Sequence, residues 1–240
     1  MSVPVRSAVD TPRLRCVLAL ISGKGGVGKS TLALALGDAF ASRGHRVAVV
    51  DLDPQGGATL AAGVTRPEDP LAADPSPAHG FMLYPSGRPL ADAPVDALAA
   101  RLSRAHDSAD VLVLDLSPSL TDAAHMAAMQ VATLAVVIAR TDAAGLPNAG
   151  EAVGLAKASG VPFVVVPSIK GPTGLAREAE AFLRGRYGEA VASTAIPLDA
   201  KAAEAAGLAR PVTQTAKRAK VSQAVHALAD ELVQRMGGTA

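Results

Sequence analysis

Two lysines lie in a glycine-rich segment that could bind phosphate groups, GKGGVGKS at residues 23–30. Glycines let the main chain curl so that its N–H groups converge on phosphate oxygens at the N-terminus of a helix. The spacing G-x-x-x-x-G-K-S is typical of a phosphate loop, in which Lys29 reaches the outer phosphates and Ser30 ligates Mg²⁺. An apolar run precedes the segment and a helical pattern follows it, as the motif requires, whereas a plain glycine turn is the alternative. Lys24 has no role in the ordinary motif.

Three aspartates could complete such a site. Asp115 ends the apolar run DVLVLD, and Asp51 and Asp53 lie in VVDLDPQGG. Because the carboxyl ends of parallel strands meet at one edge of a sheet, where ligands gather, these carboxylates are expected beside the phosphate loop. Asp115 is expected to hold Mg²⁺ through water, and the second pair to help place the attacking water. Each aspartate alone could instead be a turn or helix-cap residue.

The elements that must position these residues alternate between apolar runs and helical patterns. The runs are continuous rather than alternating, which indicates strands covered on both faces. They occupy residues 15–22, 46–53, 110–117, 134–140 and 162–168. Helical patterns cover residues 30–44 and 221–236. The predicted fold class is therefore α/β, a doubly wound, mostly parallel sheet with helices on both faces.

Length and composition bound the organisation of the chain. With 240 residues and 49% hydrophobic content, the sequence predicts one domain over residues 13–240 after a flexible tail over residues 1–12. Residues 63–80, rich in proline, are expected to form an irregular surface loop, or alternatively a partner-binding element. No apolar segment approaches the roughly 20 residues that span a bilayer. The lone Cys16 excludes an internal disulfide and favours a reducing, cytoplasmic location.

Several segments together resemble the ParA/MinD family of deviant Walker ATPases. They are KGGVGKST (24–31), VVDLDPQGGAT (49–59), LDLSPSL (114–120) and IPLDAKAAEAAGLARPV (196–212). The resemblance covers nearly everything after the tail and implies an ATPase that uses ATP and Mg²⁺ and is slow without a partner. Lys24 matches the signature lysine of the family, which in an ATP-bound homodimer reaches the phosphates of the other subunit. Nucleotide binding and dimerisation would then be one linked equilibrium.

The resemblance also implies roles for further residues. Asp53 would position the hydrolytic water, Thr31 would lie near the α-phosphate, and Asp51 would support the switch region. The implied metal site comprises Ser30, Asp53 and Asp115. The implied nucleotide contacts are Gly25, Gly26, Val27, Gly28, Lys29, Ser30 and Thr31 for the phosphates, and Pro167, Ser168, Pro197 and Leu198 for adenine. Ser117 departs from the proline usual in the ParA branch, and Arg140 and Thr141 replace a proline-then-glutamine stretch.

Three branches of the family fit poorly. The end of the chain, ELVQRMGGTA, has one arginine and no aromatic residue, unlike a basic amphipathic membrane helix. Iron–sulfur relatives need cysteines that this chain lacks, and tyrosine autokinases need a tyrosine cluster, whereas only Tyr84 and Tyr187 occur. The DNA-segregation branch remains, with a MipZ-like or MinD-like positioning ATPase acting on a protein cargo as the alternative. A metabolic P-loop kinase is a third possibility.

Non-specific binding to double-stranded DNA has support in local charge. The net charge is only +1, so binding requires a local patch, and TQTAKRAK at residues 213–220 is basic and free of acids. The candidate DNA contacts are Arg184, Arg186, Lys201, Arg210, Lys217, Arg218 and Lys220. Dimerisation would double the patch, so ATP would switch on DNA binding. We expect a nucleoid-associated protein with a ParB-like centromere-binding partner, although a solvated helical face is the alternative for the cluster.

Overall fold

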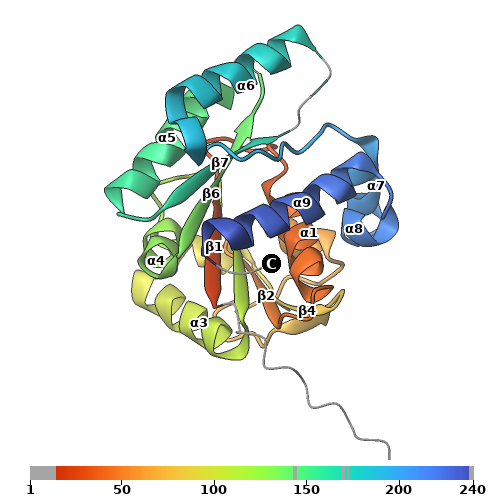
Figure 1. Cartoon of the computed structure of the whole chain (residues 1–240). Helices are drawn as coiled ribbons and strands as arrows, with labels where there is room; N and C mark the ends of the chain where they lie inside the picture. Colours follow the sequence, from red (N-terminus) through yellow and green to blue (C-terminus); the bar gives the residue numbers. More distant parts are fainter. Residues whose placement is uncertain (1–14, 143–144, 169–170, 172, 238–240) are drawn as a thin grey trace, which may run out of the picture.

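Seven strands form one open sheet in the computed structural model, which describes residues 15–142, 145–168, 171 and 173–237 (Figure 1). The strands are β1 (Cys16–Ile21), β2 (Val47–Asp51), β3 (Ser76–Ala78), β4 (Phe81–Tyr84), β5 (Val111–Asp115), β6 (Leu134–Arg140) and β7 (Phe163–Ser168). Their order in the sheet is β3-β4-β2-β5-β1-β6-β7. All neighbours are parallel except β3 and β4. The predicted α/β fold class is confirmed.

The central strand β1 shows why continuous apolar runs form this sheet. Its side chains alternate between two separate cores, with Leu18 and Leu20 on one face and Val17 and Ile21 on the other. Both faces are covered by helices, so no position in the strand can be polar without a partner. The sheet therefore separates two hydrophobic cores, and polar residues appear only where strands end.

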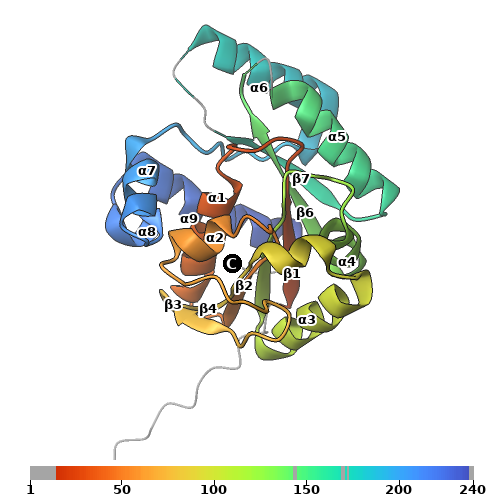
Figure 2. The ribbon, with the colours of Figure 1, turned by 180° about the vertical axis from the view of Figure 1, so that it is seen from behind.

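Nine α-helices and two short 3₁₀ segments are found in the described residues. The helices are α1 (Lys29–Ala41), α2 (Gly57–Ala61), α3 (Val95–Ser108), α4 (Ala123–Val131), α5 (Gly145–Ala158), α6 (Gly174–Tyr187), α7 (Ala200–Gly207), α8 (Val212–Thr215) and α9 (Lys220–Arg235). The 3₁₀ segments cover Arg88–Asp92 and Gly188–Ala190. Residues of α1, α7, α8 and α9 belong to the core on one face, and residues of α3, α4 and α5 to the core on the other (Figure 2).

The five strands and two helices expected from the sequence are present. The prediction of an irregular loop over residues 63–80 is wrong at its end, because β3 lies there and pairs with β4. The two strands are joined by His79 and Gly80, both with positive φ (52° and 95°), as in the tight turns that match strand twist. The expected tail over residues 1–12 lies outside the described residues, and the single-domain organisation stays a prediction. In the described ranges, no helix is long and apolar enough to cross a membrane.

Candidate nucleotide site

The phosphate loop connects β1 to α1 at the carboxyl edge of the sheet. Gly26 and Gly28 have positive φ (73° and 87°), a conformation that side chains disfavour, and Gly28 is the N-cap of α1. Within the described part of the chain, no side chain caps this helix end. The first N–H groups of α1 can therefore be offered to an anion, with the helix dipole reinforcing the attraction.

A buried ion pair lies beneath the loop. The Nζ atom of Lys29 lies 2.8 Å from Oδ1 of Asp115, and the two side chains are 7% and 0% exposed. The other oxygen of Asp115, Oδ2, is buried and has no hydrogen-bond partner among the described residues. A buried carboxylate oxygen without a partner is costly, so it is well placed to accept a bond from a ligand or a metal-bound water.

The polar side chains at this site suit a Mg²⁺ ion that is bound partly by the protein and partly by the phosphates of a ligand. No cluster of three acidic, His or Cys side chains that could cage a metal occurs within residues 15–142, 145–168, 171 and 173–237. Mg²⁺ commonly binds through one or two protein groups plus waters and substrate phosphates. Ser30, Asp115 and Asp53 are the groups that could supply them here. A side chain on Gly57 would lie 2.9 Å from the Ser30 hydroxyl, so the start of α2 closely approaches this residue.

Asp51 lies opposite Asp115 across the β2–β5 ladder. Burial raises its pKa and the Asp115 charge raises it further, whereas hydrogen bonds from Thr59 and Asp53 lower it, giving a pKa of about 7. Its Oδ2 accepts bonds from the amide and hydroxyl of Thr59, at 2.8 and 2.7 Å, and its Oδ1 accepts a 3.2 Å bond from the Asp53 amide. Asp51 therefore holds α2 and the chain after β2 in place.

Asp53 follows β2 at the same edge of the sheet and is partly exposed. Its Oδ1 accepts a 2.9 Å bond from the amide of Gln55, which folds residues 53–56 into a turn. Its main-chain oxygen accepts bonds from the Gly56 amide at 2.7 Å and the Ser86 hydroxyl at 2.6 Å. Ser86 has no motif signal in the sequence, because its relation to Asp53 depends on the pairing of β4 with β2.

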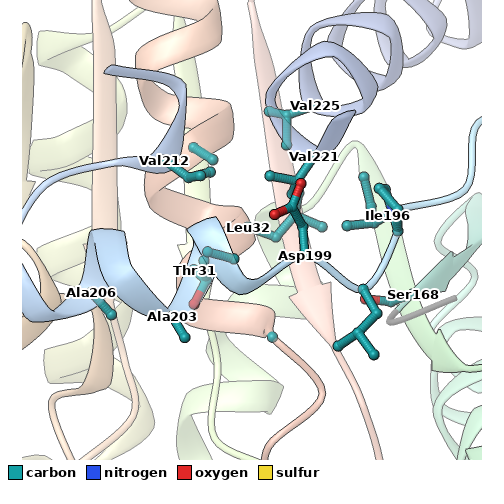
Figure 3. A pocket seen from close by; sticks show the side chains of 15 residues that line it. Thr31, Leu32, Ser168, Ile196, Asp199, Ala203, Ala206, Val212, Val221 and Val225 are labelled. Atoms are coloured by element: carbon teal, nitrogen blue, oxygen red, sulfur yellow. The ribbon is translucent and has the colours of Figure 1, made fainter. Parts of the chain in front are cut away.

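A largely apolar pocket of about 260 Å³ opens beside the phosphate loop (Figure 3). Gly28 and Thr31 line it, as do three of the four predicted adenine residues, Ser168, Pro197 and Leu198. The fourth, Pro167, is not in the wall; its carbonyl accepts a 2.8 Å bond from the Ile196 amide, which holds the 196–198 segment beside β7. The remaining wall consists mainly of side chains from α1, α7, α8 and α9, namely Leu32, Ala35, Ala202, Ala203, Ala206, Val212, Val221 and Val225.

A mostly apolar pocket with a few polar groups at its wall is suited to an aromatic base such as the predicted adenine. The sequence did not single out the valines and alanines of the wall, because on a helix they have the same pattern as ordinary core residues.

Lys24 and Lys29 have different surroundings. Lys24 is exposed, and its carbonyl accepts a 3.0 Å bond from the Ser22 hydroxyl. Lys29 is buried under the loop. The side chain of Lys24 is therefore accessible from solvent, and it makes no ion pair with any residue that the structure describes.

Two of the three residues that depart from the family pattern, Ser117 and Arg140, have local structural roles. Ser117, buried directly after β5, donates a 2.5 Å bond to Asp122, the N-cap of α4. Arg140 forms an ion pair with Asp142 at 2.7 Å. The hydroxyl of Thr141 is buried with no hydrogen-bond partner among the described residues.

The candidate DNA residues divide into two groups. Arg210, Lys217, Arg218 and Lys220 line two hollows of about 390 and 740 Å³ formed by α8, parts of α1 and α9, and the start of α7. One aspartate also lines each hollow, Asp38 the smaller and Asp199 the larger. No carboxylate in the described parts of the chain lies within ion-pair distance of these four side chains. Their charges are therefore available to an anionic partner.

The other three candidates are engaged or remote. Lys201 pairs with Glu204 and Arg184 with Glu180, each at 2.7 Å, and Arg186 stacks on Tyr187 at 5.6 Å. Helix α6, which carries both arginines, is well separated from α7 and α8 in both views (Figures 1 and 2). The structure therefore does not bring all seven residues onto one surface.

This fold and loop define a P-loop nucleotide-binding protein. The profile of the CobQ/CobB/MinD/ParA nucleotide binding domain matches residues 18–212, most of the described chain. The chain belongs to this family and is an ATPase of its ParA/MinD type.

Comparison with individual proteins gives the same result. The chain is 34% identical over 238 residues to the chromosome-partitioning ATPase Soj of Thermus thermophilus, covering 91% of this chain and 96% of that one. The Pyrococcus furiosus cell division ATPase MinD shares its fold, with a TM-score of 0.79 and 21% identity over 92% of this chain and 99% of that chain. Cobyrinic acid a,c-diamide synthase from Mycobacterium smegmatis with bound ADP and magnesium has a TM-score of 0.78 and 22% identity over 93% and 96%.

Proposed function

We propose that this protein is a partitioning ATPase that uses ATP and Mg²⁺ to control its binding to DNA. Support for nucleotide binding comes from the left-handed glycines of the loop, the buried Lys29–Asp115 pair and the unpartnered Oδ2 of Asp115. In this site Lys29 and the N-terminus of α1 bind the phosphates. Ser30 and Asp115 hold the metal, with Asp53 beside them, and Asp53 orients the attacking water. The apolar pocket beside Thr31 takes the adenine.

ATP binding brings two subunits together. Lys24 is exposed in the phosphate loop, from which its flexible ammonium group can reach the phosphates of a facing subunit. A charge delivered in trans adds attraction only when nucleotide is present, so ATP favours the dimer and the dimer favours ATP.

The dimer binds double-stranded DNA without sequence preference. The observation that carries this proposal is the cluster of four cations, Arg210, Lys217, Arg218 and Lys220, without acidic partners among the described residues. Cations of this kind contact phosphates rather than base edges, and affinity rises steeply with the number of contacts. Two clusters on one dimer therefore bind far more tightly than one.

ATP hydrolysis ends the DNA-bound state of the dimer. We infer that the protein acts in the cytoplasm on the nucleoid and that a ParB-like centromere-binding protein stimulates its slow turnover during chromosome or plasmid segregation. The similarity to the Soj chromosome-partitioning ATPase over most of both chains supports this assignment.

The proposal is tested by measuring ATP hydrolysis, dimerisation and DNA binding by the purified protein with no nucleotide, ADP, ATP and a slowly hydrolysed ATP analogue. We expect a dimer bound to DNA only with ATP or the analogue. ATP-dependent dimers that ignore DNA would replace segregation with the protein-positioning alternative. A monomer that transfers phosphate to a small acceptor would identify a metabolic kinase.

A further inference from the structure

The turn that carries Asp53, residues 53–56, has two main-chain carbonyl groups held by side chains from other parts of the chain. The hydroxyl of Ser86 donates to the Asp53 carbonyl at 2.6 Å, and Nη2 of Arg66 donates to the Gln55 carbonyl. Ser86 follows β4, and Arg66 belongs to the connection between α2 and β3. Neither residue is part of the phosphate loop or of the aspartate motifs.

Ser86 connects the turn to the core of the site. It is fully buried, and its amide donates a 2.8 Å bond to the Thr59 hydroxyl. That hydroxyl in turn donates a 2.7 Å bond to Asp51, whose carboxylate lies opposite Asp115 in the sheet. The position of the Asp53 main chain is therefore fixed relative to the metal-binding edge through Ser86.

The side chain of Arg66 packs closely against Gly56 of the turn. A side chain on Gly56 would come within 2.7 Å of Nε of Arg66, and Gly56 also has a positive φ of 64°. The turn thus needs glycine at position 56 both for its backbone conformation and to admit Arg66. The Nε atom itself is buried with no hydrogen-bond partner among the described residues, so Nη2 makes the contact that orders this side chain.

A buried arginine links the segment that contains Arg66 to the segment that contains Ser86. Arg101 of α3 is fully buried and donates to the carbonyl of Pro70, in the same connection as Arg66, and at 2.7 Å to the carbonyl of Pro85, the residue before Ser86. Its guanidinium lies over the Tyr84 ring at 5.5 Å. The proline-rich loop, defined here as residues 63–75, is therefore fastened both to the Asp53 turn and to the strand end that carries Ser86.

We propose that Ser86 and Arg66 are positioning residues for Asp53, and that the proline-rich loop sets the rate of hydrolysis through them. This inference rests on the proposed role of Asp53 in orienting the attacking water. Both contacts are to the main chain of the turn, and neither side chain lines the apolar pocket. They therefore govern where the Asp53 carboxylate points and leave the phosphate loop and the base pocket unchanged. The loop carries several exposed side chains, so a structural change at this surface can be transmitted to the turn that carries Asp53 through the Arg66 and Ser86 contacts.

The test compares Ser86→Ala and Arg66→Gln with the parent protein. Each variant should lower kcat by roughly tenfold, because small misplacements of a catalytic group have large effects on rate. ATP affinity should stay within about twofold of the parent, since neither side chain contacts the phosphate loop or the pocket. Arg66→Lys, which keeps a cationic donor for the Gln55 carbonyl, should recover most of the rate.

Two control variants separate positioning from general stability. Thr133→Ala removes a hydroxyl bonded to the main chain of Val17 at the opposite edge of the sheet, and Arg177→Gln removes an exposed arginine from α6. Both should hydrolyse ATP at the parent rate. Thermal melting shows whether each variant folds, and if Ser86→Ala does not, the Arg66→Gln and Arg66→Lys pair decides, because Arg66 lies near the surface.

The outcomes distinguish this inference from the function on which it rests. Parent values of kcat in both Ser86→Ala and Arg66→Gln would overturn it, as would an equal loss of ATP affinity and rate. If the parent protein itself hydrolysed no ATP, the proposed function would fail instead.

Discussion

Lys29 and Lys24 illustrate how position within one loop separates two roles. Lys29 is buried against Asp115, so Lys29→Ala should weaken ATP binding by roughly 100-fold, because charge-assisted bonds to phosphate contribute about 3 kcal/mol. Lys24→Ala should leave monomeric binding within about threefold and remove ATP-dependent dimers, since its side chain is exposed and is proposed to act on the nucleotide of the other subunit. Titration with a fluorescent ATP analogue and light scattering measure the two effects. Normal ATP-dependent dimerisation of Lys24→Ala would rule out the trans role.

Asp53 is predicted to act in hydrolysis rather than in binding. Asp53→Ala should reduce kcat by roughly 100-fold while ATP binding persists, because a water that is no longer oriented for attack reacts far more slowly. The variant should therefore accumulate as a dimer on DNA. Steady-state hydrolysis and a DNA retention assay measure both properties, and hydrolysis at the parent rate would refute the role of this carboxylate.

Glu231 should make the free energy of unfolding depend on pH, independently of the nucleotide site. Burial raises its pKa, but hydrogen bonds from the amides of Ser193 and Thr194 and from Arg235 outweigh that effect and set the pKa to about 2. A lowered carboxylate pKa stabilises the folded state above the unfolded value of 4.5, and this stabilisation is lost as the pH falls from 4.5 towards 2. Glu231→Gln should therefore show a flatter decline of the free energy of unfolding over that range. An unchanged pH profile in denaturant titrations would contradict this assignment.

The elements that the sequence predicts best are those whose residue pattern lies within one contiguous stretch. The phosphate loop is contiguous, and the strands around it are continuous apolar runs because both faces of the sheet are covered. The pairing of β3 with β4 could not be predicted, since β3 is three residues long and the first residue of its turn is His79 rather than the Asn, Asp or Gly that usually precedes Gly in such turns. Ser86 and Arg66 were missed for a related reason: their contacts with the Asp53 turn exist only after distant segments pack.

Helix α7 forms one wall of the apolar pocket, which gives a prediction about that element. Ala203 lines the pocket, whereas Ala200, at the start of the same helix, does not. Ala203→Phe should fill the space intended for the base and weaken ATP binding by roughly tenfold, or about 1.4 kcal/mol. Ala200→Phe, the matched control, should bind like the parent. Equal affinities for both variants in calorimetric titrations would place the base elsewhere.

Across the whole molecule, the nucleotide pocket and the basic surface are built from the same elements. Asp199 lines both the apolar pocket and the larger basic hollow. Val212 and Val221 face the pocket, and the chain between them contributes Lys217, Arg218 and Lys220 to the larger basic hollow. Occupation of the pocket can therefore affect the surface that carries the cations, in addition to any effect of dimerisation.

In the proposed function, ATP assembles a dimer whose basic clusters bind DNA phosphates. The decisive measurement is the slope of log affinity against log salt concentration for the ATP-bound protein on unrelated duplexes. The same slope is measured for a variant in which Lys217, Arg218 and Lys220 are changed together to Gln. Each phosphate contact contributes about 0.9 to the slope, so losing up to three contacts in each subunit should flatten it by as much as roughly 5. We expect the variant to bind ATP and dimerise normally but to bind DNA weakly, with this shallower slope and no sequence preference. The same affinity and the same slope as the parent would contradict the proposed function.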